Sequence, residues 1–131
     1  MADEEFRQMV IDYMDKGFLE NIISLVKQDD SLYSLIPVML GNEKLRVRLG
    51  TMSLIEELID WKPGKLSELV PAIGILLKNE SPVIRGDAIQ ALEIIGDPKA
   101  IPMLKDLSDD ANAEVREFAG EAIVRLAQVQ Q

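Results

Sequence analysis

The sequence contains neither cysteine nor histidine, and each absence removes a class of function. Without cysteine there is no disulfide framework and no thiolate metal site, and without histidine there is no imidazole ligand, general base or pH switch. Aromatic residues make up only 5% of the 131 residues, which suits helices packed through aliphatic side chains. We therefore expect no metal site, no cofactor and no enzymatic activity.

Long apolar runs and an excess of positive charge are also missing. The longest uncharged stretches, such as residues 69–77, are far shorter than the roughly 20 residues that a membrane-spanning helix needs. The first residues, MADEEF, lack the basic region of a secretory leader. The net charge of −9 would repel phosphate backbones and anionic lipid headgroups. We expect a cytoplasmic protein that binds neither nucleic acid nor membrane.

Hydrophobic residues make up 47% and charged residues 28% of the chain, which is typical of a folded domain. A chain of this length holds one compact domain or a short solenoid. Residues 3–16 and 18–27 each carry apolar side chains at the spacing of an amphipathic helix, with Gly17 between them. These two segments predict a pair of helices within residues 1–30.

From residue 31 onward the sequence repeats itself. The pair Val47-Arg48 recurs 37 residues later as Ile84-Arg85, and a further 31 residues on as Val115-Arg116. Repeats of about 30 to 40 residues are typical of a helical solenoid. The same spacings align further apolar and small positions: Ile36 with Ile73, Leu40 with Leu77, Thr51 with Ala88 and Ala119, and Leu58 with Ile95 and Leu126.

Each copy reads as a helix, a short turn and a second helix. Capping residues mark the helix starts: Asn42 or Glu43, Ser81 before Pro82, Asp97 before Pro98, and Asn112. One stripe of the second helix of residues 61–96 is apolar or small and is predicted to face the core: Ile84, Ala88, Ala91, Leu92 and Ile95.

We predict an all-α fold, a right-handed α-solenoid of about four helical hairpins in one domain spanning residues 1–131. The N-terminal helix pair, either a degenerate repeat or a cap, is followed by three repeats. Their predicted boundaries are residues 31–60, 61–96 and 97–131.

The pattern of Ile84-Arg85, the small residues after it and the segment from Ile95-Gly96-Asp97 to Ile101-Pro102 resembles HEAT-like repeats of the phycobilisome-lyase type. The resemblance covers about residues 31–128, and the first copy fits it less closely than the other two. It implies an α-solenoid, and it implies that the arginine of each copy is a regular feature of the repeat.

Three arginines, Arg48, Arg85 and Arg116, occupy equivalent positions just after the helix starts. Acidic residues in neighbouring turns, such as Glu43, Glu80 and Asp110, are natural partners for them. We predict a structural ladder that joins the repeats. The alternative is a column that binds a phosphate or a carboxylate.

The second helices carry an outward column on the side away from the core stripe. In an α-solenoid such helices usually line the concave face, so the column is a candidate groove for a partner with apolar side chains and basic flanks. Alternatively, Met52 and Ile89 pack against the next helix. The candidate residues are Leu49, Met52, Glu56, Gly86, Ile89, Glu93, Glu117, Gly120 and Val124.

Trp61, the only tryptophan, lies beside Pro63-Gly64 in the longer connection before the second repeat. Large aromatic side chains are frequent anchors in interfaces. We instead expect Trp61 to fill the joint between the first two repeats.

Two functions from different classes remain. The first is a non-catalytic scaffold that binds a basic or amphipathic segment of a partner protein on its concave face. The second is an accessory subunit or enzyme resembling the phycobilin lyases, which would need a tetrapyrrole site. A nucleic-acid reader would need a basic concave face, which this acidic sequence does not predict.

Overall fold

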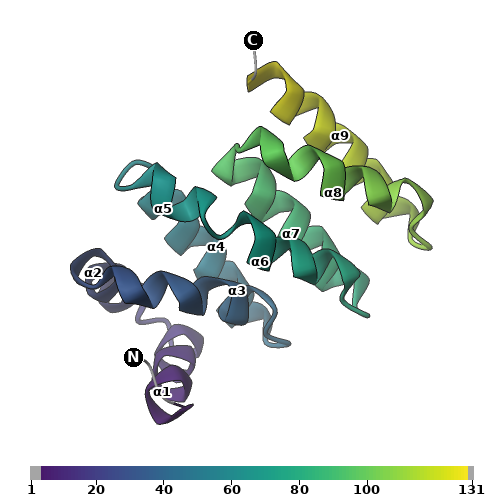
Figure 1. Cartoon of the computed structure of the whole chain (residues 1–131). Coiled ribbons are helices and arrows are strands. Elements are labelled where there is room, and N and C mark those ends of the chain that lie inside the picture. The colour runs from purple at the N-terminus through teal and green to yellow at the C-terminus, as the bar shows by residue number, and fades with distance from the viewer. Residues whose placement is uncertain (1–3, 130–131) are drawn as a thin grey trace. The chain divides into compact units, whose positions relative to one another are not determined.

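The computed structural model describes residues 4–129, which form helices and contain no strand (Figure 1). The all-α expectation is confirmed, and successive helices form the hairpins of which an α-solenoid is built. The chain divides into two compact units, residues 1–69 and residues 70–131. The predicted limits of the N-terminal pair and of the three repeats stay predictions; the division between the units falls inside the segment 61–96.

The first unit is organised around its longest helix, α4. This helix packs against α1, α2, α3 and α5, so neighbours cover it on several sides. Gly17, between α1 and α2, has a φ of +90°, a left-handed conformation that glycine adopts at little cost. The elements are α1 (Glu4–Asp15), α2 (Leu19–Gln28), the 3₁₀ helix η1 (Asp30–Ser34), α3 (Leu35–Leu40), α4 (Leu45–Ile59) and α5 (Pro63–Ser67).

The second unit contains two helical hairpins, which pack against one another through α7 and α9. Helix α7 also packs against α6, and α9 packs against α8. Gly96 ends α7 in the left-handed conformation, with φ of 76°. The elements are α6 (Val70–Ile75), η2 (Leu76–Lys78), α7 (Pro82–Ile95), η3 (Pro98–Ala100), α8 (Ile101–Lys105), η4 (Asp106–Asp109) and α9 (Ala113–Val129).

The first helices of the repeats are shorter and more broken than the sequence predicts. Each consists of a short α-helix flanked by a 3₁₀ turn or another short helix. Pro37, Pro71 and Pro102 lie in the first turns of α3, α6 and α8. Proline has no N–H and its ring clashes with the preceding turn, so a regular helix begins at these sites instead of continuing through them.

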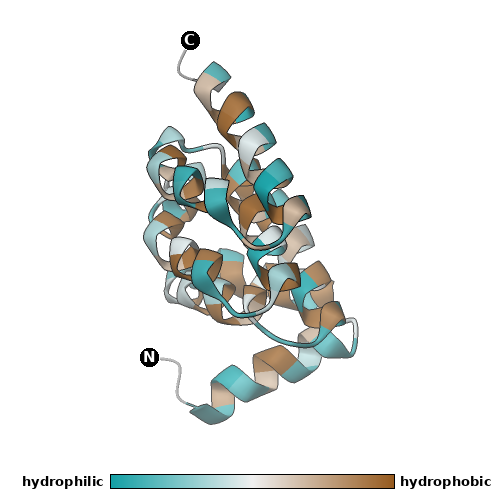
Figure 2. Ribbon diagram, turned by 90° about the vertical axis from the view of Figure 1, so that its right-hand side faces the viewer, coloured by the Kyte–Doolittle hydropathy of each residue, from teal (hydrophilic) through white to brown (hydrophobic). Residues whose placement is uncertain are grey.

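The helices are amphipathic (Figure 2), and all five residues of the predicted core stripe in α7 are buried. Three predicted helix starts are confirmed. Before η3, Asp97 Oδ1 accepts a hydrogen bond from the Lys99 N–H at 3.0 Å. Ser81 Oγ accepts a hydrogen bond from the Ile84 N–H at 3.4 Å, and Asn112 Oδ1 accepts one from the Val115 N–H at 3.0 Å. Helix α4 begins at Leu45, later than predicted, because Asn42 Oδ1 binds the Lys44 N–H and closes the preceding turn.

Gly50 lets α1 approach α4 closely, which yields a prediction. A Cβ at this position would lie 2.8 Å from Cγ of Met14, a side chain that is itself buried, and something would have to shift. We expect Gly50→Ala to lower the free energy of unfolding by about 1 kcal/mol, despite the better helix propensity of alanine. Urea denaturation followed by circular dichroism measures the change.

Gly120→Ala is the matched control, because a Cβ there meets no atom within 4 Å. Alanine in the middle of α9 should raise the free energy of unfolding by up to about 1 kcal/mol. Equal stabilisation by both substitutions would show that Met14 moves aside freely and does not fix the position of α1.

Candidate functional site

The three arginines of the predicted ladder fold back onto the turns that precede their own helices. In each case Nη1 donates to backbone carbonyl oxygens five or six residues earlier in the chain, at distances between 2.6 and 3.1 Å. These turns are therefore fixed by the arginine of the following helix. The acceptors are Asn42 and Glu43 for Arg48, Asn79 and Glu80 for Arg85, and Asp110 for Arg116.

Each of these turns is also closed by its own side chain. Asn42, Asn79 and Asp110 occupy equivalent positions, and the side-chain oxygen of each accepts the N–H two residues later at 2.9 Å. This arrangement is the Asx turn that asparagine and aspartate favour. The third copy differs from the others because its turn residue carries a negative charge.

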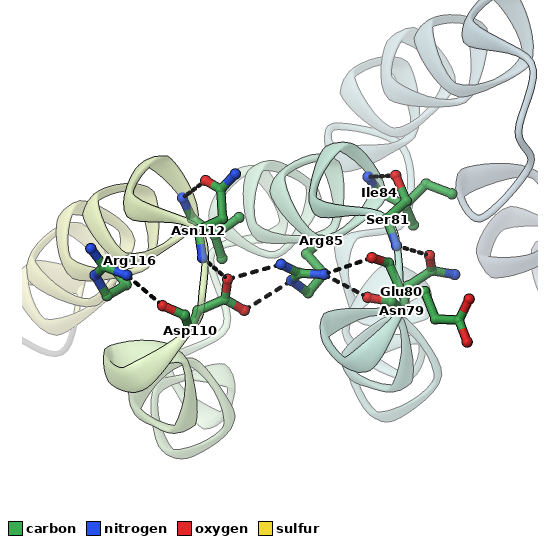
Figure 3. Close-up of polar contacts among 9 residues, drawn as sticks. Asn79, Glu80, Ser81, Ile84, Arg85, Asp110, Asn112 and Arg116 are labelled. Atoms are coloured by element: carbon green, nitrogen blue, oxygen red, sulfur yellow. Dashed lines mark hydrogen bonds and ion pairs between the residues drawn. The ribbon is translucent and has the colours of Figure 1, made fainter.

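The charge on Asp110 links two hairpins of the second unit (Figure 3). Arg85, on α7, donates a hydrogen bond from Nη2 to Asp110 Oδ2 at 2.9 Å, and its Nε lies 2.9 Å from Asp110 Oδ1 within the same ion pair. The Arg85 and Asp110 side chains are only 12% and 8% exposed. Nη1 and Nη2 of Arg85 donate to carbonyl and carboxylate oxygens of the protein itself, which favours the structural role over binding of an external anion.

The ion pair predicts acid sensitivity. The hydrogen bond from Arg85, helped by the Asn112 N–H, lowers the pKa of Asp110 below its ordinary value. Because the folded-state pKa is the lower one, the pair contributes stability above the ordinary carboxyl pKa of about 4, and the contribution is lost as pH falls through the folded-state pKa. We expect Asp110→Asn to flatten the pH dependence of unfolding between about pH 5 and pH 2.

Urea denaturation at a series of pH values measures this dependence. The neighbouring exposed residue provides a control, since Asp109→Asn changes the net charge equally without touching Arg85. If both variants keep the pH dependence of the parent protein, the ion pair does not govern acid sensitivity.

The candidate residues of the outward column differ in how far they are buried. Leu49 and Val124 are exposed at 58% and 59%, as expected for residues that face solvent or a partner. Met52 and Ile89 are 7% and 2% exposed and belong to the core, so the burial supports the alternative that they pack against neighbouring helices, and their assignment to a partner-binding surface is wrong. Helices α4 and α7 are each contacted by several neighbours, and their buried arc is wider than one stripe. Of the other candidates, Glu56, Glu117 and Gly120 are exposed, and Gly86 and Glu93 are half-buried.

A groove of about 590 Å³ lies between α7 and α9. Its lining residues show that the two helices run in the same direction, since the start of α7 lies opposite the start of α9. The lining of the groove includes Gly86, Ile89 and Glu93, the outward residues predicted for the second repeat. Ile89 and Val115 are buried at its base. The full lining is Pro82, Val83, Gly86, Asp87, Ile89, Gln90, Glu93, Asn112, Glu114, Val115, Phe118, Glu121 and Arg125.

Phe118 is the largest apolar residue of this groove that sequence reasoning missed; Val83, Glu114 and Glu121 were missed as well. Its side chain is 45% exposed, and its ring lies against Gly86, where an added Cβ would stand 3.9 Å from Phe118 Cδ2. Equivalent positions in the other repeats carry Gly50 and Asp87. The available signal was therefore a large aromatic residue where the other copies have a glycine and an aspartate.

An ion pair crosses one end of the groove. Arg125 Nη1 of α9 lies 2.7 Å from Glu93 Oε2 of α7. Glu114 and Glu121 of α9 are exposed and form no ion pair with any residue between 4 and 129. With Arg125 paired, the walls of the groove carry an excess of negative charge.

Trp61 belongs to the first unit, and its side chain is 49% exposed. The Nζ of Lys27 lies 5.0 Å from the centre of its ring, within the range of a cation–π interaction. A side chain with half its surface in solvent is not a buried plug, so that expectation for Trp61 is wrong.

Within residues 4–129, no helix is long and apolar enough to cross a membrane. No cluster of three or more potential ligand side chains that could hold a metal ion lies in the same range.

Comparisons with known proteins bear on the repeats. The family described as HEAT repeats matches the chain over residues 34–124. Neither a search of curated proteins nor one of solved structures returned a match.

Proposed function

Because the chain belongs to the HEAT-repeat family, we propose that it is a non-catalytic protein–protein interaction scaffold that binds its partner through the second helices of its repeats, α4 in the first unit and α7 and α9 in the second. HEAT repeats are generally scaffolds for protein interactions. In an α-solenoid the second helices line the concave face, where partners are usually gripped. The chain acts in the cytoplasm and binds neither nucleic acid nor membrane in this proposal.

One observation carries the proposal. Among residues 4–129, large apolar side chains remain exposed along all three second helices, beyond what the core uses. Exposed apolar groups of this kind, set among acidic residues, are typical of a protein-binding surface. They are Leu45 and Leu49 on α4, Val83 on α7, and Phe118 and Val124 on α9.

The finer resemblance to phycobilisome-lyase repeats supports the alternative of an accessory subunit or enzyme that handles a tetrapyrrole. No cluster of side chains described above favours that alternative. Incubation of the purified protein with a bilin, followed by absorbance spectroscopy, tests it: a shifted and intensified bilin band would support it.

The scaffold proposal is tested by replacing exposed apolar residues with charged ones. Leu49→Glu combined with Val124→Glu places charges on two second helices at sites that are 58% and 59% exposed, so the fold should survive. Affinity capture from a lysate of the source organism, with mass spectrometry and crosslinking, should lose at least one protein that the parent chain retains.

Exposed apolar residues on first helices provide the control. Val38 on α3 and Ile75 on α6 are 39% and 72% exposed, and Val38→Glu/Ile75→Glu makes the same chemical change on the other helices of the hairpins. This variant should retain the partner. Loss of the partner only with the first-helix variant would move the binding surface to those helices and overturn the proposal.

A further inference from the structure

The groove between α7 and α9 has the composition of a peptide-binding site. Val83 and Phe118 offer exposed apolar surface at 55% and 45%, above the buried base formed by Ile89 and Val115. Apolar side chains of a partner would cover this surface and gain the free energy of its removal from water.

The charges around the groove determine whether its partner must be acidic or basic. Glu114 and Glu121 of α9 line the groove, whereas Arg125 is held by Glu93. Lysine and arginine side chains of a ligand would meet these carboxylates. A second copy of this chain, with a net charge of −9, and a nucleic acid would both be repelled.

The dimensions of the groove suit a helix. It runs along α7 from Val83 to the Glu93–Arg125 ion pair, a length of about 15 Å or three helical turns at 1.5 Å per residue. Because α7 and α9 lie next to one another in the same direction, they present parallel ridges onto which a third helix packs. The ion pair fixes the end of the groove.

We infer that this groove binds a basic amphipathic helix of a partner protein, with apolar residues at i, i+3 or i+4 and i+7 seated on Val83 and Phe118 and basic residues beside Glu114 and Glu121. The inference rests on the proposed scaffold function and names the class of its partner.

The direct test uses a synthetic peptide of about 14 residues built from leucine and lysine in an amphipathic helical pattern. Titration into the ¹⁵N-labelled full chain should shift the amide resonances of α7 and α9 most. Binding should weaken as NaCl rises from about 50 to 500 mM. The same peptide with glutamate in place of lysine should not bind. Shifts concentrated outside α7 and α9 would overturn the inference.

Two variants separate the groove from general charge attraction. Glu114→Gln/Glu121→Gln should raise the Kd of the leucine–lysine peptide about 5-fold at low salt, and Phe118→Ala more than about 10-fold. Glu20→Gln/Glu57→Gln removes the same charge from exposed positions in the first unit and should leave the Kd within about 2-fold. Equal weakening by both double variants would show that the peptide binds through the net charge of the protein alone, and it would overturn the inference.

Further outcomes distinguish this inference from the scaffold proposal. If the cellular partner or the peptide is lost with Leu49→Glu but kept with Phe118→Ala, the scaffold function stands and the groove is not its site. If sedimentation shows that the chain alone dimerises and Phe118→Ala abolishes the dimer, a second copy occupies the groove and the inference fails. If the chain retains no protein partner and no peptide, both proposals fail.

Discussion

Ile89→Glu is expected to unfold the second unit. The Ile89 side chain is 2% exposed on α7, so the substitution removes buried apolar surface and puts a carboxylate in its place without a cationic partner. The combined cost should exceed about 4 kcal/mol, against a total stability of about 5 to 15 kcal/mol for a typical domain. Circular dichroism should show loss of helix, and the amide resonances of residues 70–129 should collapse toward random-coil positions.

Val124→Glu is the matched control on the neighbouring second helix. The Val124 side chain is 59% exposed, so the same charge stays in solvent and the free energy of unfolding should change by less than about 0.5 kcal/mol. A folded Ile89→Glu protein with an unchanged denaturation midpoint would mean that Ile89 faces solvent and that the core of this unit has been assigned wrongly.

Arg85→Ala is expected to lower the free energy of unfolding by about 3 kcal/mol. The substitution removes the ion pair with Asp110 that joins the hairpins, including its Nη2 hydrogen bond, and the two hydrogen bonds to the carbonyl oxygens of Asn79 and Glu80. It also leaves a carboxylate of low exposure without its cation, which costs more than the loss of the attraction alone. Urea denaturation followed by circular dichroism gives the change directly.

Asp110→Asn provides the graded comparison, because it installs the residue that the other two repeats carry at this position. The amide oxygen still accepts the Asn112 N–H and preserves the turn, so the cost should fall to about 1 to 2 kcal/mol. In a double-mutant cycle, Arg85→Ala/Asp110→Asn should cost less than the sum of the two single variants. Strict additivity would show that the two side chains do not stabilise one another.

The repeats and their helix starts could be read from the sequence because each depends on local chemistry. Ser81 and Asn112 supply a side-chain oxygen to an N–H three residues later, and a proline or a small residue follows each of them. The stripe from Ile84 to Ile95 is buried because one face of α7 must face the core whatever its neighbours are. Such features need no knowledge of the rest of the fold.

The candidate site was harder to predict from the sequence, because it depends on how many neighbours each helix has in the fold. A periodic pattern identifies one buried face, but α7 packs against α6 on one side and α9 on another. Ile89 therefore passes from the predicted surface into the core, and Met52 does so on α4 for the same reason. Phe118 was overlooked because its equivalents in the other repeats, Gly50 and Asp87, indicate nothing about an aromatic groove.

The contact between Arg85 and Asp110 also has a consequence for building longer chains from this one. Arg116 already binds its own turn through the Asp110 carbonyl oxygen, as Arg85 binds the turn at Asn79. If residues 99–129 were duplicated in tandem, the copy of Asp110 would be presented to Arg116 as Asp110 is presented to Arg85. The arginine of one module would thus form an ion pair with the aspartate of the next module. Arrays of any length could then be assembled from identical modules.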